Sequence, residues 1–372
     1  MTSRERLLAA LQRRQPDRVP VTLYEHSPFN HDWANQEPSY APLLALEARY
    51  GDSFVRAPVD CPVFLGNPNS VSGSQEHHAD GALVRTTTIE TPKGPLRGVT
   101  RRDPGLMTNW QVEPLIKSDA DIERVLSMPD PPATVDVARI HALAEQVGDA
   151  GLLLFDIGDA IGHVVGLFDF EDFVLRCITD DGPIRALVDK AQALVVQAIQ
   201  AIGAVVDQAA FRLWGPEYCG APLLNPHVFF PRYVLEQDKA ATAAAHATNN
   251  FSIIHCHGKL RDILDMIAET GADGLEPIET LPLETADVTA AEVKARVGSR
   301  MCLMGLVQAV TFETGTPEDV RRQVREAINA AGNGGGLVLL PTAAPFMLPL
   351  TPQSLSNAEA MYRAAHEFGR YA

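Results

Sequence analysis

The sequence predicts a mixed α/β fold, a (β/α)8 TIM barrel with an N-terminal extension and a β-hairpin insertion. From about residue 150 onward, short apolar runs alternate with longer segments of helical period, which is the pattern of repeated βα units around a parallel sheet. The apolar runs are nearly continuous, as expected of strands covered on both faces. With 46% hydrophobic and 21% charged residues, the 372-residue chain has enough apolar material for a substantial core.

Eight segments are expected to form the barrel strands. Six of them follow from the alternation, and residues 19–24 and 54–59 supply the other two. The six are residues 152–156, 211–214, 251–255, 274–278, 301–306 and 337–341.

Helices are expected between these strands. Over residues 259–269, Leu260, Ile263, Leu264 and Ile267 fall on one face of a helix. Another helix is expected to begin after Thr316, because an N-cap threonine, a proline and two acids follow one another there. Further helices are expected over residues 183–202, 288–297 and 354–368.

We expect a single domain over residues 1–372. Residues 60–115 interrupt the alternation and are rich in Pro, Gly, Asn and Thr. Within them, residues 83–89 and 96–100 flank a Pro-Lys-Gly-Pro turn and predict a β-hairpin. We interpret this stretch as an insertion that covers the mouth of the barrel.

Charge and hydropathy exclude several classes of protein. The net charge of −16 and the absence of any Lys/Arg run longer than two residues argue against a nucleic-acid partner. No stretch of about 18 consecutive apolar residues occurs and the N-terminus lacks a signal-peptide core, so we expect no membrane contact and a cytoplasmic protein. Five widely spaced cysteines without a C-x-x-C pair do not suggest a disulfide framework.

The most informative segment is Phe251-Ser-Ile-Ile-His255-Cys-His257-Gly-Lys259. Side chains alternate along a strand, so His255 and His257 point to one side, at the end of the strand where barrel enzymes carry their catalytic groups. Imidazole is the commonest metal ligand. The two histidines therefore either hold a metal ion or bind substrate without one.

Acids follow the neighbouring strands. Glu276 and Glu279 come at the end of the next strand, and strand alternation predicts that they do not point the same way while the chain stays extended; we favour Glu279, which lies at the loop. Asp156 and Asp159 end an earlier strand and are candidates for acid–base chemistry or for capping the next helix.

Another candidate cluster follows residues 211–214. Trp214, Glu217 and Tyr218 offer a ring, a carboxylate and a phenol in a loop rich in Gly and Pro. We expect Glu217 and Tyr218 to be catalytic and Trp214 to bind substrate. No G-x-G-x-x-G follows a strand, so no nucleotide cofactor is expected.

The chain resembles the uroporphyrinogen decarboxylase superfamily in a series of short motifs. The motifs occur in the order of that superfamily across nearly the whole sequence. They are RERLLAAL (4–11), PDRVPV (16–21), HCHG (255–258), GADGLEPIE (271–279), GTPEDV (315–320), TP (351–352), NAEAM (357–361) and GRY (369–371).

The superfamily includes metal-free decarboxylases and zinc-dependent methyltransferases that move methyl groups between corrinoids and thiols. By that resemblance, His255, His257 and Glu279 would be the zinc ligands, with His257 at the place of a cysteine. A later cysteine ligand is replaced here by Leu-Pro-Thr-Ala-Ala at residues 340–344.

Two reactions follow from the resemblance. The first is a metal-assisted methyl transfer that involves a corrinoid, a thiol or a methyl ether, with His26 and His31 as further substrate-binding residues. The second is a metal-free decarboxylation (a lyase reaction), with Asp156 or Glu217 as proton donor.

We favour methyl transfer because no arginine lies between Arg18 and Arg49 to grip a polycarboxylate. The expected partners are a small-molecule substrate, a corrinoid protein and a second copy of the chain. The third hypothesis is a ligand-binding barrel without catalytic activity.

Overall fold

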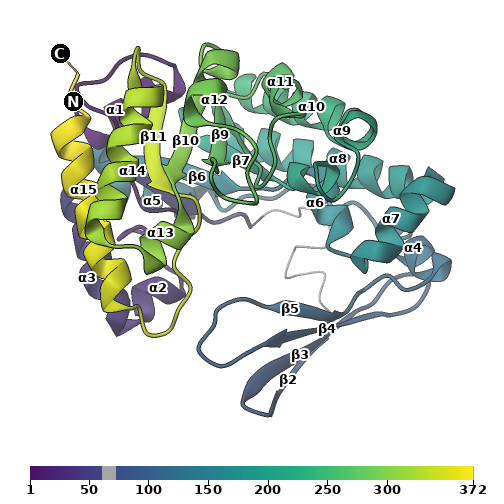
Figure 1. Ribbon diagram of the computed structural model, residues 1–372. Coiled ribbons are helices and arrows are strands. Elements are labelled where there is room, and N and C mark those ends of the chain that lie inside the picture. The colour runs from purple at the N-terminus through teal and green to yellow at the C-terminus, as the bar shows by residue number, and fades with distance from the viewer. Residues whose placement is uncertain (61–72, 372) are drawn as a thin grey trace.

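The computed structural model describes residues 1–60 and 73–371. Its centre is a curled, seven-stranded parallel sheet in the order β1-β6-β7-β8-β9-β10-β11 (Figure 1). The strands are β1 (Ser53–Ala57), β6 (Gly151–Asp156), β7 (Ala210–Trp214), β8 (Phe251–His255), β9 (Gly274–Ile278), β10 (Cys302–Val307) and β11 (Leu337–Pro341). Seven of the eight expected strands are therefore confirmed, with every neighbouring pair parallel.

The eighth expected strand, residues 19–24, does not form a regular ladder. The segment does lie between the two edges of the sheet, because Thr22 N donates to Leu339 O (3.0 Å) and Asp52 N donates to Val21 O (2.7 Å). Within the described chain it makes one parallel bridge, Val21 to Leu339. Pro20 has no N–H to give, and the N–H of Val21 goes to the carboxylate of Asp52 (3.1 Å). The expectation of a strand is wrong here for these two reasons.

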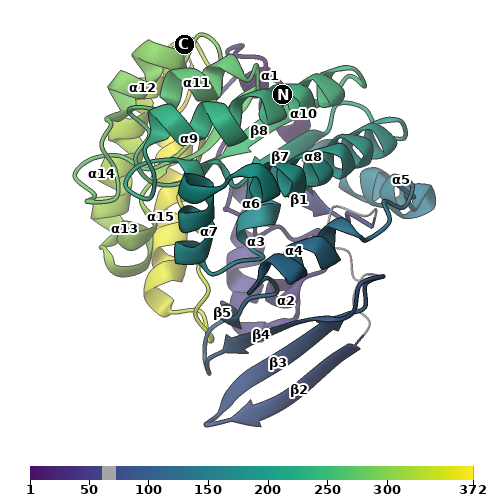
Figure 2. The ribbon, with the colours of Figure 1, turned by 90° about the vertical axis from the view of Figure 1, so that its right-hand side faces the viewer.

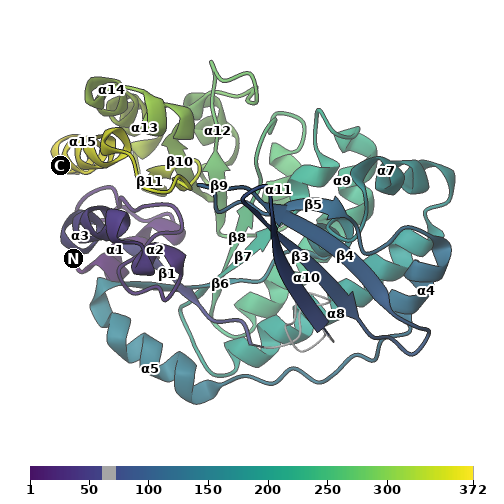
Figure 3. The same cartoon turned by 90° about the horizontal axis from the view of Figure 1, so that it is seen from below.

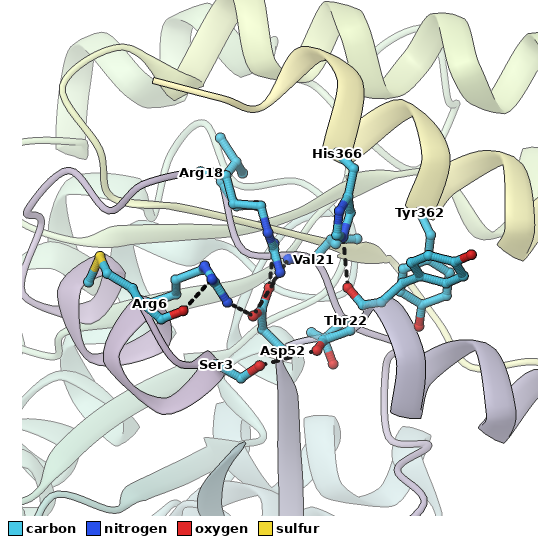
Figure 4. A network of polar contacts seen from close by, with 12 residues as sticks. Ser3, Arg6, Arg18, Val21, Thr22, Asp52, Tyr362 and His366 are labelled. Carbon is cyan, nitrogen blue, oxygen red and sulfur yellow. Dashed lines mark hydrogen bonds and ion pairs between the residues drawn. The ribbon is translucent and has the colours of Figure 1, made fainter. Parts of the chain in front are cut away.

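A buried ion-pair cluster fixes this segment to the rest of the molecule (Figure 4). The side chain of Asp52 is completely buried and accepts from Arg18 Nη1 (2.6 Å) and Arg6 Nη1 (3.0 Å). Arg6 belongs to helix α1 (Ser3–Leu11), so the N-terminal extension is tied to the same carboxylate. The hydrogen bonds to Asp52 thus replace ladder hydrogen bonds that this segment does not make.

Helices cover the outside of the sheet (Figures 1 and 2). They are α2 (Trp33–Gln36), α3 (Ala41–Tyr50), α4 (Asp119–Leu126), α5 (Val137–Val147), α6 (Ala160–Val165), α7 (Phe170–Thr179), α8 (Gly182–Gly203), α9 (Pro226–Tyr233), α10 (Leu235–His246), α11 (Leu264–Glu269), α12 (Ala290–Val297), α13 (Ala309–Thr314), α14 (Pro317–Ala327) and α15 (Pro352–Phe368).

Two of these helices show how local sequence sets their starts. Helix α14 begins as expected, with the Thr316 hydroxyl accepting from Asp319 N in a capping box. Helix α11 begins five residues later than expected, because the Asp287 carboxylate binds the N–H groups of Leu260 and Arg261 and holds them in a turn. In the described part of the chain, no helix is long and apolar enough to cross a membrane.

A second, antiparallel sheet is formed by β2 (Gly73–Ala79), β3 (Ala82–Ile89), β4 (Leu96–Arg102) and β5 (Trp110–Glu113). The expected hairpin is confirmed as β3–β4, and two further strands flank it. The sheet lies on the side where the parallel strands end (Figure 1) and overlaps those ends in the view from below (Figure 3). It contacts that side through a bridge between Leu106 and Met347 and a hydrogen bond from Gln111 Nε2 to Phe168 O (2.8 Å).

Strand alternation sorts the residues inside the curled sheet into layers. Leu152, Leu154, Ala210, Ile253 and Met304 pack in one buried cluster inside it. Two positions farther along three of these strands come Asp156, Arg212 and His255, on the same side by parity. The interior is therefore apolar at its base and polar at the carboxyl ends of the strands, where barrel enzymes place their active sites.

Candidate active site

The polar layer is centred on Arg212, which is only 3% exposed. Its Nε donates to Asp156 Oδ1 (3.0 Å), its Nη2 to Glu25 Oε1 (3.0 Å) and its Nη1 to Glu276 Oε1 (3.3 Å). A buried guanidinium needs such partners. Burial opposes ionisation of Asp156, but the charge of Arg212 outweighs it and lowers the pKa of that carboxyl. Asp156 is thus an ionised group and not a ready proton donor.

Glu276 also contacts His255, which joins a short chain of polar groups. His255 Nδ1 lies 3.5 Å from Glu276 Oε1 and 2.8 Å from the hydroxyl of Tyr24. Arg212 Cζ stands 5.6 Å from the centre of the Tyr24 ring. Burial and the charge of Glu276 raise the pKa of Tyr24 well above its ordinary value. The hydroxyl therefore keeps its proton and stays a hydrogen-bonding group.

The second histidine forms a separate pair with Glu279. His257 Nδ1 lies 3.4 Å from Glu279 Oε1, and the other oxygen of that carboxylate accepts from Gly258 N (2.9 Å). The His255 and His257 rings stand edge to face, with their centres 4.8 Å apart. Burial opposes the imidazolium form, but Glu279 outweighs this effect and raises the pKa of His257. The structure therefore brings His255, His257 and Glu279 together.

Glu276 and Glu279 both contact a histidine, so the structure adds Glu276 to the Glu279 that we favoured. Strand β9 ends at Ile278, so Glu279 already lies outside the extended chain to which the alternation applies. Glu276 is 3% exposed and faces the interior. It belongs to the site together with Tyr24, Glu25 and Arg212, none of which the sequence analysis singled out as a site residue.

The loop after β7 lies to one side of this cluster. The Trp214 ring packs on Gly158 and Gly162 and stands 5.0 Å from the His163 ring. Glu217 Oε2 accepts from Gly215 N (3.2 Å), and its charge also raises the pKa of His257. Tyr218 packs toward Phe170, with ring centres 6.3 Å apart. Of the three, Glu217 is electrostatically linked to His257.

Asp159 has the capping role that we considered for it. Its Oδ1 accepts from Gly162 N (2.6 Å) at the start of α6.

The two histidines of the N-terminal loop have different surroundings. His26 is buried, with its ring against Trp33 and Tyr40, and its Nε2 lies 3.2 Å from Pro345 O. His31 is exposed and lines a cavity of about 420 Å³ that Arg56 also lines. Arg56 Nη2 lies 3.3 Å from Asp156 Oδ2, so this cavity adjoins the polar layer. The space between Tyr24, Arg212 and Glu276 is itself only about 10 Å³.

The arrangement does not fit a complete zinc site. Across residues 1–60 and 73–371, no group of three or more His, Cys, Asp or Glu side chains could hold a metal ion. Cys256 is buried on the outer side of the strand and cannot join the two histidines. Thr342, in the segment where the resemblance places a cysteine, has its hydroxyl bound to Ala309 N (3.0 Å). His257 and Glu279 offer two of the four ligands that zinc usually takes.

A curled parallel sheet with ionisable groups at its carboxyl end is the architecture of a TIM-like enzyme. Comparison with known proteins makes this more specific. Residues 220–368 match the family model of uroporphyrinogen decarboxylase (URO-D). The match covers β8 to β11 and the two histidines, so the chain is similar to that family over this stretch.

Among solved structures, the chain is similar to a methyltransferase from Methanosarcina mazei. The TM-score is 0.62, the sequences are 20% identical, and the match covers 99% of both chains. At 20% sequence identity, this similarity supports a shared fold and no more. A search of curated proteins finds no match.

Proposed function

We propose that the chain is a methyltransferase of the superfamily that acts on a small substrate of little negative charge. The observation that carries the proposal is the state of Arg212, whose guanidinium is already bound by three carboxylates. A polycarboxylate such as uroporphyrinogen needs cationic donors that are free to bind it. At this mouth it would meet Asp156, Glu25 and Glu276 instead.

The His257–Glu279 pair supplies the chemistry that methyl transfer requires. His257 takes the proton of a thiol or hydroxyl acceptor, and Glu279 stabilises the imidazolium that forms. The freed electron pair of the acceptor makes the new bond to the methyl carbon. The bond between that carbon and the methyl donor breaks, and its electron pair leaves with the donor.

The methyl donor in this proposal is a corrinoid or a methyl ether. A corrinoid, brought by a partner protein, supplies a methyl group on a good leaving atom. A zinc ion would polarise the acceptor, but the residues present do not complete its site, so the proton transfer above is assigned to His257 alone. We further propose that residues 19–22 close the sheet into a barrel and that the chain forms a homodimer.

The test compares the two reactions of the superfamily on the purified protein. We expect methylation of a thiol by methylcobalamin and no conversion of uroporphyrinogen to coproporphyrinogen, followed by chromatography. His257→Ala should lower the rate of methyl transfer by about a hundredfold or more, whereas His77→Ala, an exposed histidine of β2, should not. Uroporphyrinogen decarboxylation that is unaffected by His257→Ala would overturn the proposal in favour of the metal-free decarboxylase.

Metal content is measured on the same samples. Because His255, His257 and Glu279 do not form a complete site, we expect less than one zinc per chain by elemental analysis. One tightly held zinc per chain, lost in His257→Ala, would contradict this expectation and assign a metal ion to the site.

A further inference from the structure

The polar layer at the carboxyl end of the sheet carries more negative than positive charge. Two guanidinium groups, those of Arg56 and Arg212, meet three carboxylates there, those of Glu25, Asp156 and Glu276. Burial opposes ionisation of Glu276, but its histidine and arginine neighbours outweigh that effect and lower the pKa of the carboxyl. One negative charge is therefore left without a cation, and such a charge is costly where it is shielded from water.

Glu276 has an oxygen that is free to bind a cation. The residue is 3% exposed, and its Oε1 makes the contacts with Arg212 (3.3 Å) and His255 (3.5 Å). Within the described residues, Oε2 accepts no hydrogen bond, and the protein does not enclose this atom completely. A carboxylate oxygen in a largely buried side chain is costly without a donor. A ligand that donates a hydrogen bond can reach Oε2 and remove that cost.

The space beside Glu276 fits one small group. Tyr24, Glu25, Arg212 and Glu276 line a space of about 10 Å³, close to the volume of one water-sized sphere. A primary ammonium group has about this size, whereas a carboxylate or a sulfonate is larger. Glu25 offers a second acceptor, because its Oε2 lies 3.9 Å from Arg56 Nη1, too far for a hydrogen bond. Size and charge therefore both favour an ammonium group.

The position of the histidine pair sets the length of the ligand. His255 lies between Glu276 and His257, since its Nδ1 is 3.5 Å from Glu276 Oε1 and its ring centre is 4.8 Å from that of His257. We propose that the methyl acceptor is a short aminothiol, whose ammonium group binds Glu276 and Glu25 while its thiol gives a proton to His257. This inference rests on the proposed methyl transfer and names its acceptor. The thiolate sulfur forms the bond to the methyl carbon, and the electron pair of the broken bond leaves with the methyl donor.

The test compares three two-carbon thiols of different charge, with methylcobalamin as the methyl donor. They are 2-aminoethanethiol, 2-mercaptoethanol and 2-mercaptoethanesulfonate. We expect kcat/KM, corrected for the ionised fraction of each thiol, to be at least tenfold higher for the cation than for the neutral thiol and lowest for the anion. Glu25→Gln removes one of the two acceptors and should lower the preference for the cation about tenfold, the effect of losing one hydrogen bond to a charged group.

Glu145→Gln is the matched control, because Glu145 is an exposed acid of α5. It should keep the preference of the wild type. Titration calorimetry of the full chain with 2-aminoethanethiol and 2-mercaptoethanesulfonate measures the charge preference without the donor, so it decides the matter even if Glu25→Gln fails to fold. Failure to methylate any of the thiols, with tighter binding of the cation, would overturn the proposed function and keep the ammonium site. Equal binding of cation and anion, or the same preference in Glu25→Gln and Glu145→Gln, would refute the aminothiol.

Discussion

At the scale of single residues, Arg212 holds together the acids at the carboxyl end of the parallel sheet. Replacing it by methionine leaves the half-buried Asp156 and the buried Glu276 without their cation. Removing one partner of a buried ion pair costs about 3–5 kcal/mol. We therefore expect Arg212→Met to lower the free energy of unfolding by about that amount, measured by urea denaturation at pH 7.

Arg56→Met is the control for this variant. Arg56 contacts Asp156 and Glu25 at 3.3 and 3.9 Å, but its side chain is 40% exposed. Its loss should cost about 1 kcal/mol or less. The deficit of Arg212→Met should shrink in acid, as the carboxyl groups become neutral. Equal losses in the two variants would mean that Arg212 does not hold the acids.

The pKa of His257 depends on Glu279. Glu279→Gln removes the charge that stabilises the imidazolium, so the pKa of His257 should fall, as followed by an NMR titration of the ring. Methyl transfer should then retain its rate to lower pH, because the base stays neutral there. Glu284→Gln, an exposed acid in the same loop, should leave the titration unchanged. An unaltered pKa in Glu279→Gln would contradict this account.

The sequence allows part of this site to be predicted. His255 and His257 are predictable from side-chain alternation at a strand end. Arg212 is predictable too, from its position inside an apolar strand. An arginine inside an apolar strand must be paired, and parity places it on the side of His255. Tyr24 could not be found in this way, since its contact with His255 spans 231 residues and depends on how the sheet curls.

At the scale of elements, apolar runs located the parallel strands because those strands are buried on both faces. The same signal failed at residues 19–24, where Pro20 and the Asp52 carboxylate replace ladder hydrogen bonds. It also failed at β2, which is exposed along most of its length and has no apolar pattern to detect. Side-chain contacts that hold a segment in place are thus less visible in sequence than the ladder hydrogen bonds that they replace.

Glu47 is such a contact, and it makes stability depend on pH. This buried residue of α3 accepts from Thr22, Ser53 and Leu23 N, and Tyr362 of α15 also donates to it. Burial outweighs these hydrogen bonds and raises the pKa of Glu47 from 4.5 to about 7. Between these values the folded chain binds a proton that the unfolded chain has lost, so stability falls as pH rises.

We expect this fall to be about 3 kcal/mol from pH 4.5 to pH 7. It should be absent in Glu47→Gln, whose urea unfolding is compared with that of the wild type at pH 5, 6, 7 and 8. Glu145→Gln, an exposed acid of α5, should keep the pH dependence of the wild type. Parallel curves for the wild type and Glu47→Gln would show that Glu47 ionises freely when folded.

At the scale of the whole molecule, the parallel sheet and its helices hold most of the core. The large buried cluster runs through the strands and the helices around them. Within residues 73–113, all of them described, Ala82, Ile89 and Leu96 are the buried apolar side chains. The antiparallel sheet therefore depends on the larger body for its burial.

This dependence predicts how the antiparallel sheet behaves alone. A peptide of residues 73–113 should be unfolded, because a sheet needs one apolar face covered to be stable, and three buried side chains cannot offset the entropy of ordering about forty residues. We expect little amide dispersion in its NMR spectrum and no cooperative thermal transition. Met347→Asp in the full chain, at the bridge to Leu106, should increase hydrogen exchange in β3 and β4 and leave that of β8 and β9 unchanged. A dispersed spectrum with a cooperative melt would instead make residues 73–113 a domain with a core of its own.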